Sequence, residues 1–338
     1  MKYWELSAPG VLNLEHNNTA IVPEGYAKVK VQLVCLTASD IDAYLGEAEE
    51  YPLTIGRQAV GYISEIGENN RILTRGQRVV VDPRITCGAC YACKNNRPTV
   101  CENGRIMGLE SAGMLSDFAI VPVRNLYPLP PHVKNEDALY VEPLAMANRI
   151  FTEANMAKGA HAVIFGSSSL GILLAQVLIY QQIIPIIIDS HDENLEYARK
   201  HGIYYTINSG TGNVISQIKQ LTSGRLCEHS IYLSSGGEKP QDALDCLQQG
   251  GTLVLAGYSG KDSRSNVKIG SIFNKQLRVI GINNGGKYIE SAINLIAKHE
   301  VNLSTLPVKE LDFDELPSQI KPYAEEQNFL HRLVVKFS

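Results

Sequence analysis

The chain has 338 residues, of which 44% are hydrophobic and 20% charged, so it can bury a large core and exceeds the usual size of one domain. A formal net charge of -4, without a long run of Lys or Arg, excludes the phosphate-neutralising surface that nucleic-acid binding needs. The first residues lack the apolar stretch of a signal peptide and four of the seven cysteines are clustered, which together favour a reducing, cytoplasmic compartment.

The segment from Ala27 to Pro122 contains short alternating strands with Gly and Pro between them. Residues 28–33, 60–66 and 78–81 are the clearest of these strands. The pattern predicts a β-barrel-type domain for this half of the chain.

Four cysteines follow one another at short spacings in a loop with Gly and Pro: Cys87, Cys90, Cys93 and Cys101. Thiolates at this spacing match the soft ligands of a tetrahedral zinc site, whereas free cysteines or disulfides do not explain the clustering. Four thiolates leave no open coordination position. We therefore expect one structural zinc per chain, which braces a lobe of about residues 84–105 and performs no chemistry.

After about residue 158, short apolar strands alternate with helices, at 162–165, 186–188, 203–207, 230–233 and 252–256. This alternation predicts a doubly wound parallel sheet, so the fold class is α/β. The apolar stretch 170–188 approaches the length of a membrane span, but Gln176, Gln181, Gln182 and Pro185 interrupt it. We interpret it as a buried helix followed by a strand.

A turn flanked by glycines, Gly166 to Gly171, joins the strand 162–165 to this helix. Gly166 permits the tight turn, Gly171 allows close helix packing, and the N-terminal N–H groups of the helix, at Ser169 and Leu170, suit a dinucleotide pyrophosphate. Ser168 replaces the usual middle glycine, so the cofactor must shift slightly or accept a hydroxyl hydrogen bond. An ordinary Ser-rich, N-capped turn is the alternative, but the flanking strand and helix favour a dinucleotide site.

Asp189 lies at the end of the second apolar strand, 23 residues after Gly166. An acid at this place can hydrogen-bond the ribose 2'-hydroxyl and repel a 2'-phosphate. We therefore predict NAD as the cofactor, in preference to NADP.

The helix-rich segment 136–155 joins the two halves, and the last strand, 331–337, follows an acidic, Pro-containing stretch that can return it to the first domain. We expect one domain from residues 1–135 and 300–338 and a second from residues 136–299.

The cysteine lobe, the dinucleotide turn and the string Val141-Glu142-Pro143-Leu144-Ala145 together resemble the zinc-type alcohol and polyol dehydrogenases of the medium-chain dehydrogenase/reductase superfamily. The similarity covers essentially the whole chain. It implies a GroES-like catalytic domain, a Rossmann-type cofactor domain, an active-site cleft between them, and dimers or tetramers.

The sequence differs from that family at the residues that would bind a second, catalytic zinc. Matching Ser39-Asp40 to the family's Ser/Thr-Asp pair puts Thr37 at the place of a ligand cysteine, and Gly56-Arg57-Gln58 stands in place of Gly-His-Glu. Only Glu142 matches a ligand. A neutral hydroxyl, a cation without a lone pair and a weak amide ligand do not hold zinc, so we expect no catalytic zinc.

Arg57 is the candidate for the missing positive charge, paired with Glu142, which would otherwise be an uncompensated carboxylate in a partly buried cleft. Alternatives are an exposed surface role for Arg57 and, after a two-residue register slip, Cys35 in place of Thr37. The resemblance implies that the Ser39 hydroxyl helps relay the alcohol proton and that Asp40 orients the site. A plain strand-end cap is the alternative for Ser39.

These patterns favour an NAD(P)-dependent oxidoreductase, without catalytic zinc, that transfers hydride to or from a small alcohol, sugar, polyol or carbonyl substrate. Arg57 cannot lower an alcohol's pKa by coordination, so reduction of an activated carbonyl or double bond is favoured over simple alcohol oxidation. The other hypothesis is a catalytically silent relative that binds dinucleotide as a sensor or scaffold. By analogy we expect a homodimer or homotetramer, with sheets continued near Leu253 and Val279, and no nucleic-acid or membrane partner.

Overall fold

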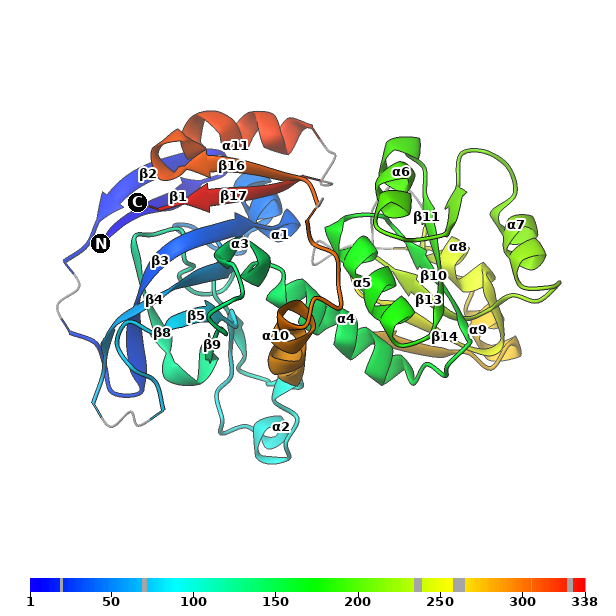
Figure 1. The fold of residues 1–338 in the computed structure, drawn as a ribbon, viewed down its shortest axis with the longest axis horizontal. Coiled ribbons are helices and arrows are strands. Elements are labelled where there is room, and N and C mark those ends of the chain that lie inside the picture. The colour runs from blue at the N-terminus through cyan, green and yellow to red at the C-terminus, as the bar shows by residue number, and fades with distance from the viewer. Residues whose placement is uncertain are drawn as a thin grey trace. The chain divides into compact units, whose positions relative to one another are not determined.

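The computed structural model describes residues 1–18, 21–68, 72–233, 239–257, 265–304, 306–326 and 331–337. The chain divides into two compact units (Figure 1). The first comprises Met1–Glu142, Ile296–Lys298 and Pro307–Ser338, and the second comprises Pro143–Leu295 and His299–Leu306. None of the described helices is both long enough and apolar enough to cross a membrane.

The first unit is built mainly from strands. They are β1 (Lys2–Ala8), β2 (Val11–His16), β3 (Tyr26–Leu36), β4 (Gln58–Ile66), β5 (Arg78–Val81), β6 (Arg84–Ile85), β7 (Arg105–Ile106), β8 (Phe118–Pro122), β9 (Leu126–Pro128), β16 (Val308–Asp312) and β17 (Arg332–Lys336). Its helices are α1 (Ala38–Asp42), α2 (Tyr91–Lys94), α3 (Asn135–Ala138) and α11 (Leu316–Glu325), and α4 (Val141–Ala154) begins at its boundary.

The main sheet of this unit has the strand order β16-β17-β3-β4-β5-β9, and β8 also pairs with β3. Inward-facing side chains of these strands, such as Val29, Val31 and Ile63, fill one hydrophobic core, as the alternating pattern predicted. Within the sheet, Cys35 of β3 lies opposite Gln58 of β4 on one side and opposite a residue of β17 on the other. The register therefore brings the start of β4 and the start of the last strand to the same place.

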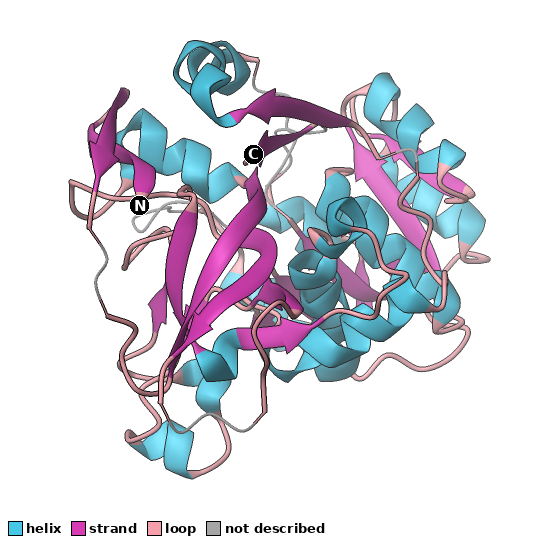
Figure 2. Cartoon of the chain, turned by 60° about the vertical axis from the view of Figure 1, so that its left-hand side comes forward, coloured by secondary structure: helices cyan, strands magenta, loops and turns pink. Residues whose placement is uncertain are grey.

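The second unit contains a six-stranded parallel sheet with helices between its strands (Figure 2). The strands are β10 (His161–Phe165), β11 (Ile184–Asp189), β12 (Tyr205–Asn208), β13 (Cys227–Tyr232), β14 (Leu247–Leu255) and β15 (Arg278–Gly281). The helices are α5 (Ser169–Tyr180), α6 (Asp192–Lys200), α7 (Val214–Leu221), α8 (Pro240–Asp245), α9 (Ile269–Asn274) and α10 (Ile289–Ala297).

The order β12-β11-β10-β13-β14-β15 confirms the doubly wound sheet, because the winding reverses beside β10. The apolar stretch 170–188 forms most of α5 and β11, a buried helix followed by a strand, as expected. The expectation that a strand near Leu253 extends the sheet to another copy is wrong, because β14 is paired on both sides, with β13 and β15. Val279 lies in β15, the end strand of the described sheet, and is 40% exposed.

Candidate functional site

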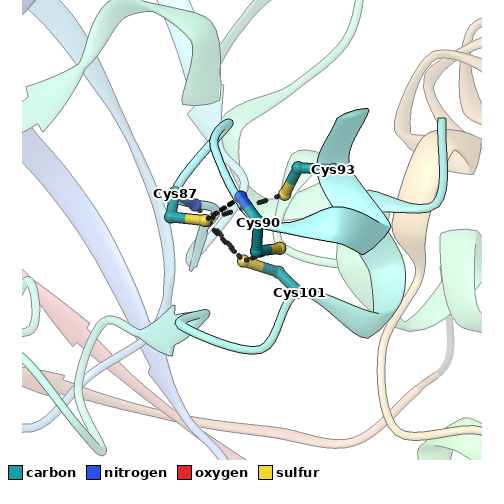
Figure 3. Close-up of side chains that lie close together, drawn as sticks. All are labelled: Cys87, Cys90, Cys93 and Cys101. Carbon is teal, nitrogen blue, oxygen red and sulfur yellow. Dashed lines mark hydrogen bonds between the residues drawn. The ribbon is translucent and has the colours of Figure 1, made fainter. Parts of the chain in front are cut away.

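Four cysteine side chains converge in the lobe around α2 (Figure 3), those of Cys87, Cys90, Cys93 and Cys101. Their sulfur atoms all lie within 4.8 Å of one another, with 3.4 Å between Cys87 and Cys101 and 3.8 Å between Cys90 and Cys101. Tetrahedral zinc with bonds of about 2.3 Å needs sulfurs about 3.8 Å apart, so the cluster fits zinc. Backbone N–H groups of Ala89 and Cys90 donate to Cys87 Sγ and lower the pKa of Cys87 to about 6, which favours the thiolate.

Glu142, at the start of α4, is hydrogen-bonded to an amide. Gln58 Nε2 donates to Glu142 Oε2 at 2.6 Å, and Arg332 Nη2 donates to Gln58 Oε1. The same Arg332 nitrogen donates to the carbonyl oxygen of Leu139 at 3.0 Å, and the guanidinium carbon lies 4.1 Å from the centre of the Tyr140 ring. These contacts fix the amide of Gln58, with its oxygen toward Arg332 and its nitrogen toward the carboxylate.

The predicted pairing of Arg57 with Glu142 is wrong. Both residues are described, and no ion pair within 4 Å joins them. Gln58, the first residue of β4, makes the contact to Glu142, and Arg57 lies just before that strand. The charge of Arg57 acts on Asp40, and Arg57 is half-buried, with a buried Nε that lacks a hydrogen-bond partner among the described atoms. Arg57 is therefore not an exposed surface side chain.

Thr37, Ser39 and Asp40 lie together where β3 ends and α1 begins. Thr37 Oγ1 donates to Asp40 Oδ2 at 2.6 Å and lies 3.1 Å from Ser39 Oγ. The backbone N–H of Thr37 donates to the same Oδ2 and that of Gly56 donates to Oδ1, both at 2.7 Å. Gly56 has a φ of 91°, and a Cβ there would lie 2.8 Å from Val34 Cγ1, so this contact to Asp40 requires glycine.

The alternative in which Cys35 takes the place of Thr37 stays a prediction, and the two side chains differ in burial. Cys35 is 1% exposed within β3, whereas Thr37 follows the end of the strand and is the N-cap residue of α1. Thr37 is itself extended, with a φ of -100° and a ψ of 170°, so strand alternation still relates the directions of the two side chains.

The turn after β10 has the two glycines where the backbone needs them. Gly166 has a φ of 108°, and a Cβ on Gly171 would lie only 2.1 Å from the carbonyl oxygen of Gly166. Ser168 is the N-cap residue of α5, and among the described residues its hydroxyl makes no cap hydrogen bond. The first intrahelical donor is Ile172, so the N–H groups of Ser169 and Leu170 precede the hydrogen-bonded turns of the helix.

Asp189 ends β11, is 1% exposed and is already hydrogen-bonded at both carboxylate oxygens. Ser167 donates to Oδ2 from its hydroxyl and, at 3.0 Å, from its backbone N–H, while the backbone N–H of His191 donates to Oδ1 at 2.9 Å. Burial alone would raise the pKa of Asp189, but the hydrogen bonds from Ser167 and His191 bring it below its ordinary value. Asp189 is thus charged at neutral pH, and Ser167 is a neighbour that sequence reasoning missed.

Sequence reasoning also missed Arg332 and Asp82. Arg332 is 8% exposed at the start of an otherwise largely apolar strand. Asp82 directly follows apolar β5, and burial raises its pKa to about 7, aided by the charge of Glu142 and opposed by a hydrogen bond from the backbone of Arg84. A charged residue next to an apolar run was the available signal for both.

Two family profiles match this chain. The profile described as alcohol dehydrogenase GroES-like domain matches residues 23–131, and the profile described as zinc-binding dehydrogenase matches residues 169–298. The chain belongs to the zinc-type dehydrogenases of the medium-chain dehydrogenase/reductase superfamily. The resemblance inferred from the sequence is confirmed, and so is the fold of a GroES-like domain and a Rossmann-type domain.

Several proteins resemble this chain along much of their length. An uncharacterised zinc-type alcohol dehydrogenase-like protein of Haemophilus influenzae is 28% identical over 307 residues, which cover 89% of each chain. An L-threonine 3-dehydrogenase of Pyrococcus abyssi is 28% identical over 249 residues, 71% of each chain. A solved structure from Escherichia coli CFT073, described as a short chain alcohol dehydrogenase complexed with NADH, shares the fold with a TM-score of 0.91 and 24% identity, covering 100% of this chain and 99% of that one.

Proposed function

We propose that this dehydrogenase is an NAD-dependent oxidoreductase that works without a catalytic zinc. The observation that carries the proposal is the hydrogen bond from the Gln58 amide to Glu142, the only residue that matches a catalytic zinc ligand. Across the described part of the chain, only the four cysteines form a group of three or more potential ligands close enough together to hold a metal. Thr37 and Arg57 add no ligand of the kind that zinc prefers.

The residues of the second unit support dinucleotide binding. The turn from Gly166 to Gly171 and the N-terminus of α5 would hold the pyrophosphate, and Asp189 would face the adenosine ribose. The lowered pKa of Asp189 keeps it negative at neutral pH, which favours NAD over NADP because a 2'-phosphate would be repelled. When bound, the nicotinamide supplies or accepts a hydride.

In the first unit, Arg57 and Ser39 are the groups that we assign to the substrate. Arg57 would place a positive charge beside the reacting oxygen, and the Ser39 hydroxyl would exchange a proton with it. Without metal coordination the pKa of an alcohol stays high, so reduction of a carbonyl is favoured over oxidation of a simple alcohol. The substrate class is a small alcohol, sugar, polyol or carbonyl compound.

We further propose that two copies of this chain associate through β15. Its partners in the described sheet lie on one side only, and Val279 is 40% exposed on it. Light scattering on the wild type and on Val279→Lys tests this, since a charged edge should lower the assembly to a monomer.

Metal analysis and cofactor titration test the enzyme proposal. We expect one zinc per chain, NADH binding tighter than NADPH binding by fluorescence, and NADH oxidation with a member of a panel of carbonyls, sugars and enones, or NAD reduction with L-threonine or polyols. A second zinc would refute the proposal. Tight NADH binding without turnover of the panel would instead favour the catalytically silent relative.

A restoration experiment tests the assignment of positions in the degenerate site. The triple variant Thr37→Cys, Arg57→His and Gln58→Glu should bind a second metal next to Glu142, because it restores thiolate, imidazole and carboxylate ligands. Two zinc ions per folded chain are expected, and the variant Cys35→Ala in the same background should not remove the second one. A folded triple variant with a single zinc would show that the positions are wrongly matched.

A further inference from the structure

A chain of hydroxyl groups leads to a buried carboxylate in the first unit. Ser39 Oγ lies 3.1 Å from Thr37 Oγ1, which donates to Asp40 Oδ2 at 2.6 Å. Ser39 and Thr37 are half-buried, while Asp40 is 0% exposed. The hydroxyls are thus the partly accessible end of a hydrogen-bonded row that ends inside the protein.

Thr37 is suited to pass a proton because a hydroxyl both donates and accepts. Its one proton is committed to Asp40 in the observed arrangement, so its oxygen can accept from Ser39. When Asp40 is protonated, the same three groups can reverse direction, with Asp40 donating to Thr37 and Thr37 donating to Ser39. A thiolate bound to a metal at this position would allow neither arrangement.

Asp40 has the surroundings of a group that can hold or release a proton. Burial raises its pKa, while the positive charge of Arg57, the hydrogen bonds from Thr37 and the N–H of Gly56 oppose the rise. Asp42 and Cys35 are titratable groups that also feel its charge. The ionised carboxylate therefore has stabilising partners, while burial acts in the opposite direction and favours the neutral form.

We propose that Ser39, Thr37 and Asp40 form a proton relay, with Ser39 contacting the substrate and Asp40 holding the proton. The proposal rests on the proposed function for the identity of the reaction. Thr37 and Asp40 act through Ser39 and are positioning residues in this scheme.

The proton and electron balance of carbonyl reduction is complete with these groups. The carbonyl carbon accepts a hydride from bound NADH, and the carbonyl oxygen takes the proton of Ser39 as the C=O double bond becomes a single bond. Ser39 recovers a proton from Thr37, and Thr37 recovers one from protonated Asp40. The sum is an alcohol, NAD and an ionised Asp40, and the oxidation direction runs through the same steps in reverse.

A measurement that needs no substrate tests the connection between Asp40 and solvent. In protein labelled with ¹³C at aspartate carboxyls, the Asp40 signal is assigned with Asp40→Asn, and its rate of proton exchange with solvent is measured by relaxation dispersion near its midpoint of titration. The rate should fall at least about tenfold, as for a barrier raised by about 1.4 kcal/mol, in Thr37→Val and in Ser39→Ala. Thr37→Ser should restore it.

The two substitutions differ in what else they change in this region. Thr37→Val also removes the N-cap side chain of α1 and can loosen this region, whereas Ser39→Ala leaves the contact between Thr37 and Asp40 intact. An exchange rate in Ser39→Ala equal to that of the wild type would overturn the proposal, because protons would then reach Asp40 by another route.

Turnover separates the relay from the proposed function. With a substrate found in the panel, Ser39→Ala and Thr37→Val should lower kcat at unchanged NADH affinity and remove the pH dependence that Asp40 imposes, and Thr37→Ser should recover both. If turnover in Thr37→Val keeps the wild-type pH profile, the relay is refuted. Slowed exchange in the variants of a protein that binds NADH but turns over no substrate would support the relay and refute the proposed reaction.

Discussion

Replacing Gln58 by Met should destabilise the first unit strongly, although the two side chains are similar in size. The change removes the donor to Glu142 Oε2 and the acceptor for Arg332 Nη2, and it leaves Arg332 with the Leu139 carbonyl and the face of Tyr140. Hydrogen bonds to charged groups are worth about 1.5–3 kcal/mol each, so the loss of two lowers the free energy of unfolding by about 4 kcal/mol. A urea dependence of about 2 kcal/mol per M turns this into a midpoint lower by about 2 M.

The single tryptophan makes this effect measurable in the unit where it occurs. Trp4 belongs to the first unit, packs against Phe313 with 5.6 Å between ring centres and donates from Nε1 to the Phe313 carbonyl oxygen at 2.9 Å. Gln32→Met is the matched control, because the Gln32 amide makes only a 3.4 Å contact, to the carbonyl of Val31. Equal midpoints for the two variants, followed by Trp4 fluorescence in urea, would refute the role given to the Gln58 amide.

The remaining predictions concern the zinc lobe, the glycine turn and Asp82. Treatment with a chelator should release one zinc and expose four additional reactive thiols, those of the cysteine cluster. The buried thiols of Cys35, Cys227 and Cys246 should stay unreactive. A thiol titration that shows no such increase would contradict the zinc site. Gly171→Ala should weaken NADH binding and destabilise the second unit by about 2–3 kcal/mol, because the new Cβ meets a backbone oxygen at 2.1 Å. The control Gly270→Ala has open space around the new Cβ, so in thermal unfolding it should be neutral or stabilising by up to about 1 kcal/mol. Asp82→Asn should make the protein more stable than the wild type above about pH 7, by at most about 4 kcal/mol, and should leave the stability unchanged below about pH 4. The reason is that the pKa of Asp82 is higher in the folded state than in the unfolded state, so the wild type loses stability as the pH rises from about 4 to about 7. Urea unfolding at pH 5 and pH 9 checks the sign, and a gap that shrinks toward high pH is incompatible with it.

The features that the sequence predicted correctly are those set by residues close together in the chain. The four cysteines lie within fifteen residues, so chain geometry alone brings their sulfur atoms near one another. The glycines of the dinucleotide turn follow from backbone conformation and close packing over six residues, and the alternation of apolar strands and helices reflects the two periods of side-chain direction. Such features depend on neighbours along the chain, which a sequence displays directly.

The partners of the charged side chains were decided only by the tertiary structure. Arg332 meets Gln58 across 274 residues of sequence, because β17 and β4 both flank β3, and nothing in either local segment specifies that meeting. For the same reason Arg57 was matched to the wrong carboxylate, because Gln58 makes the hydrogen bond to Glu142 and the charge of Arg57 acts on Asp40. Spacing in the sequence establishes which residues lie near the site, and strand register decides which of them touch.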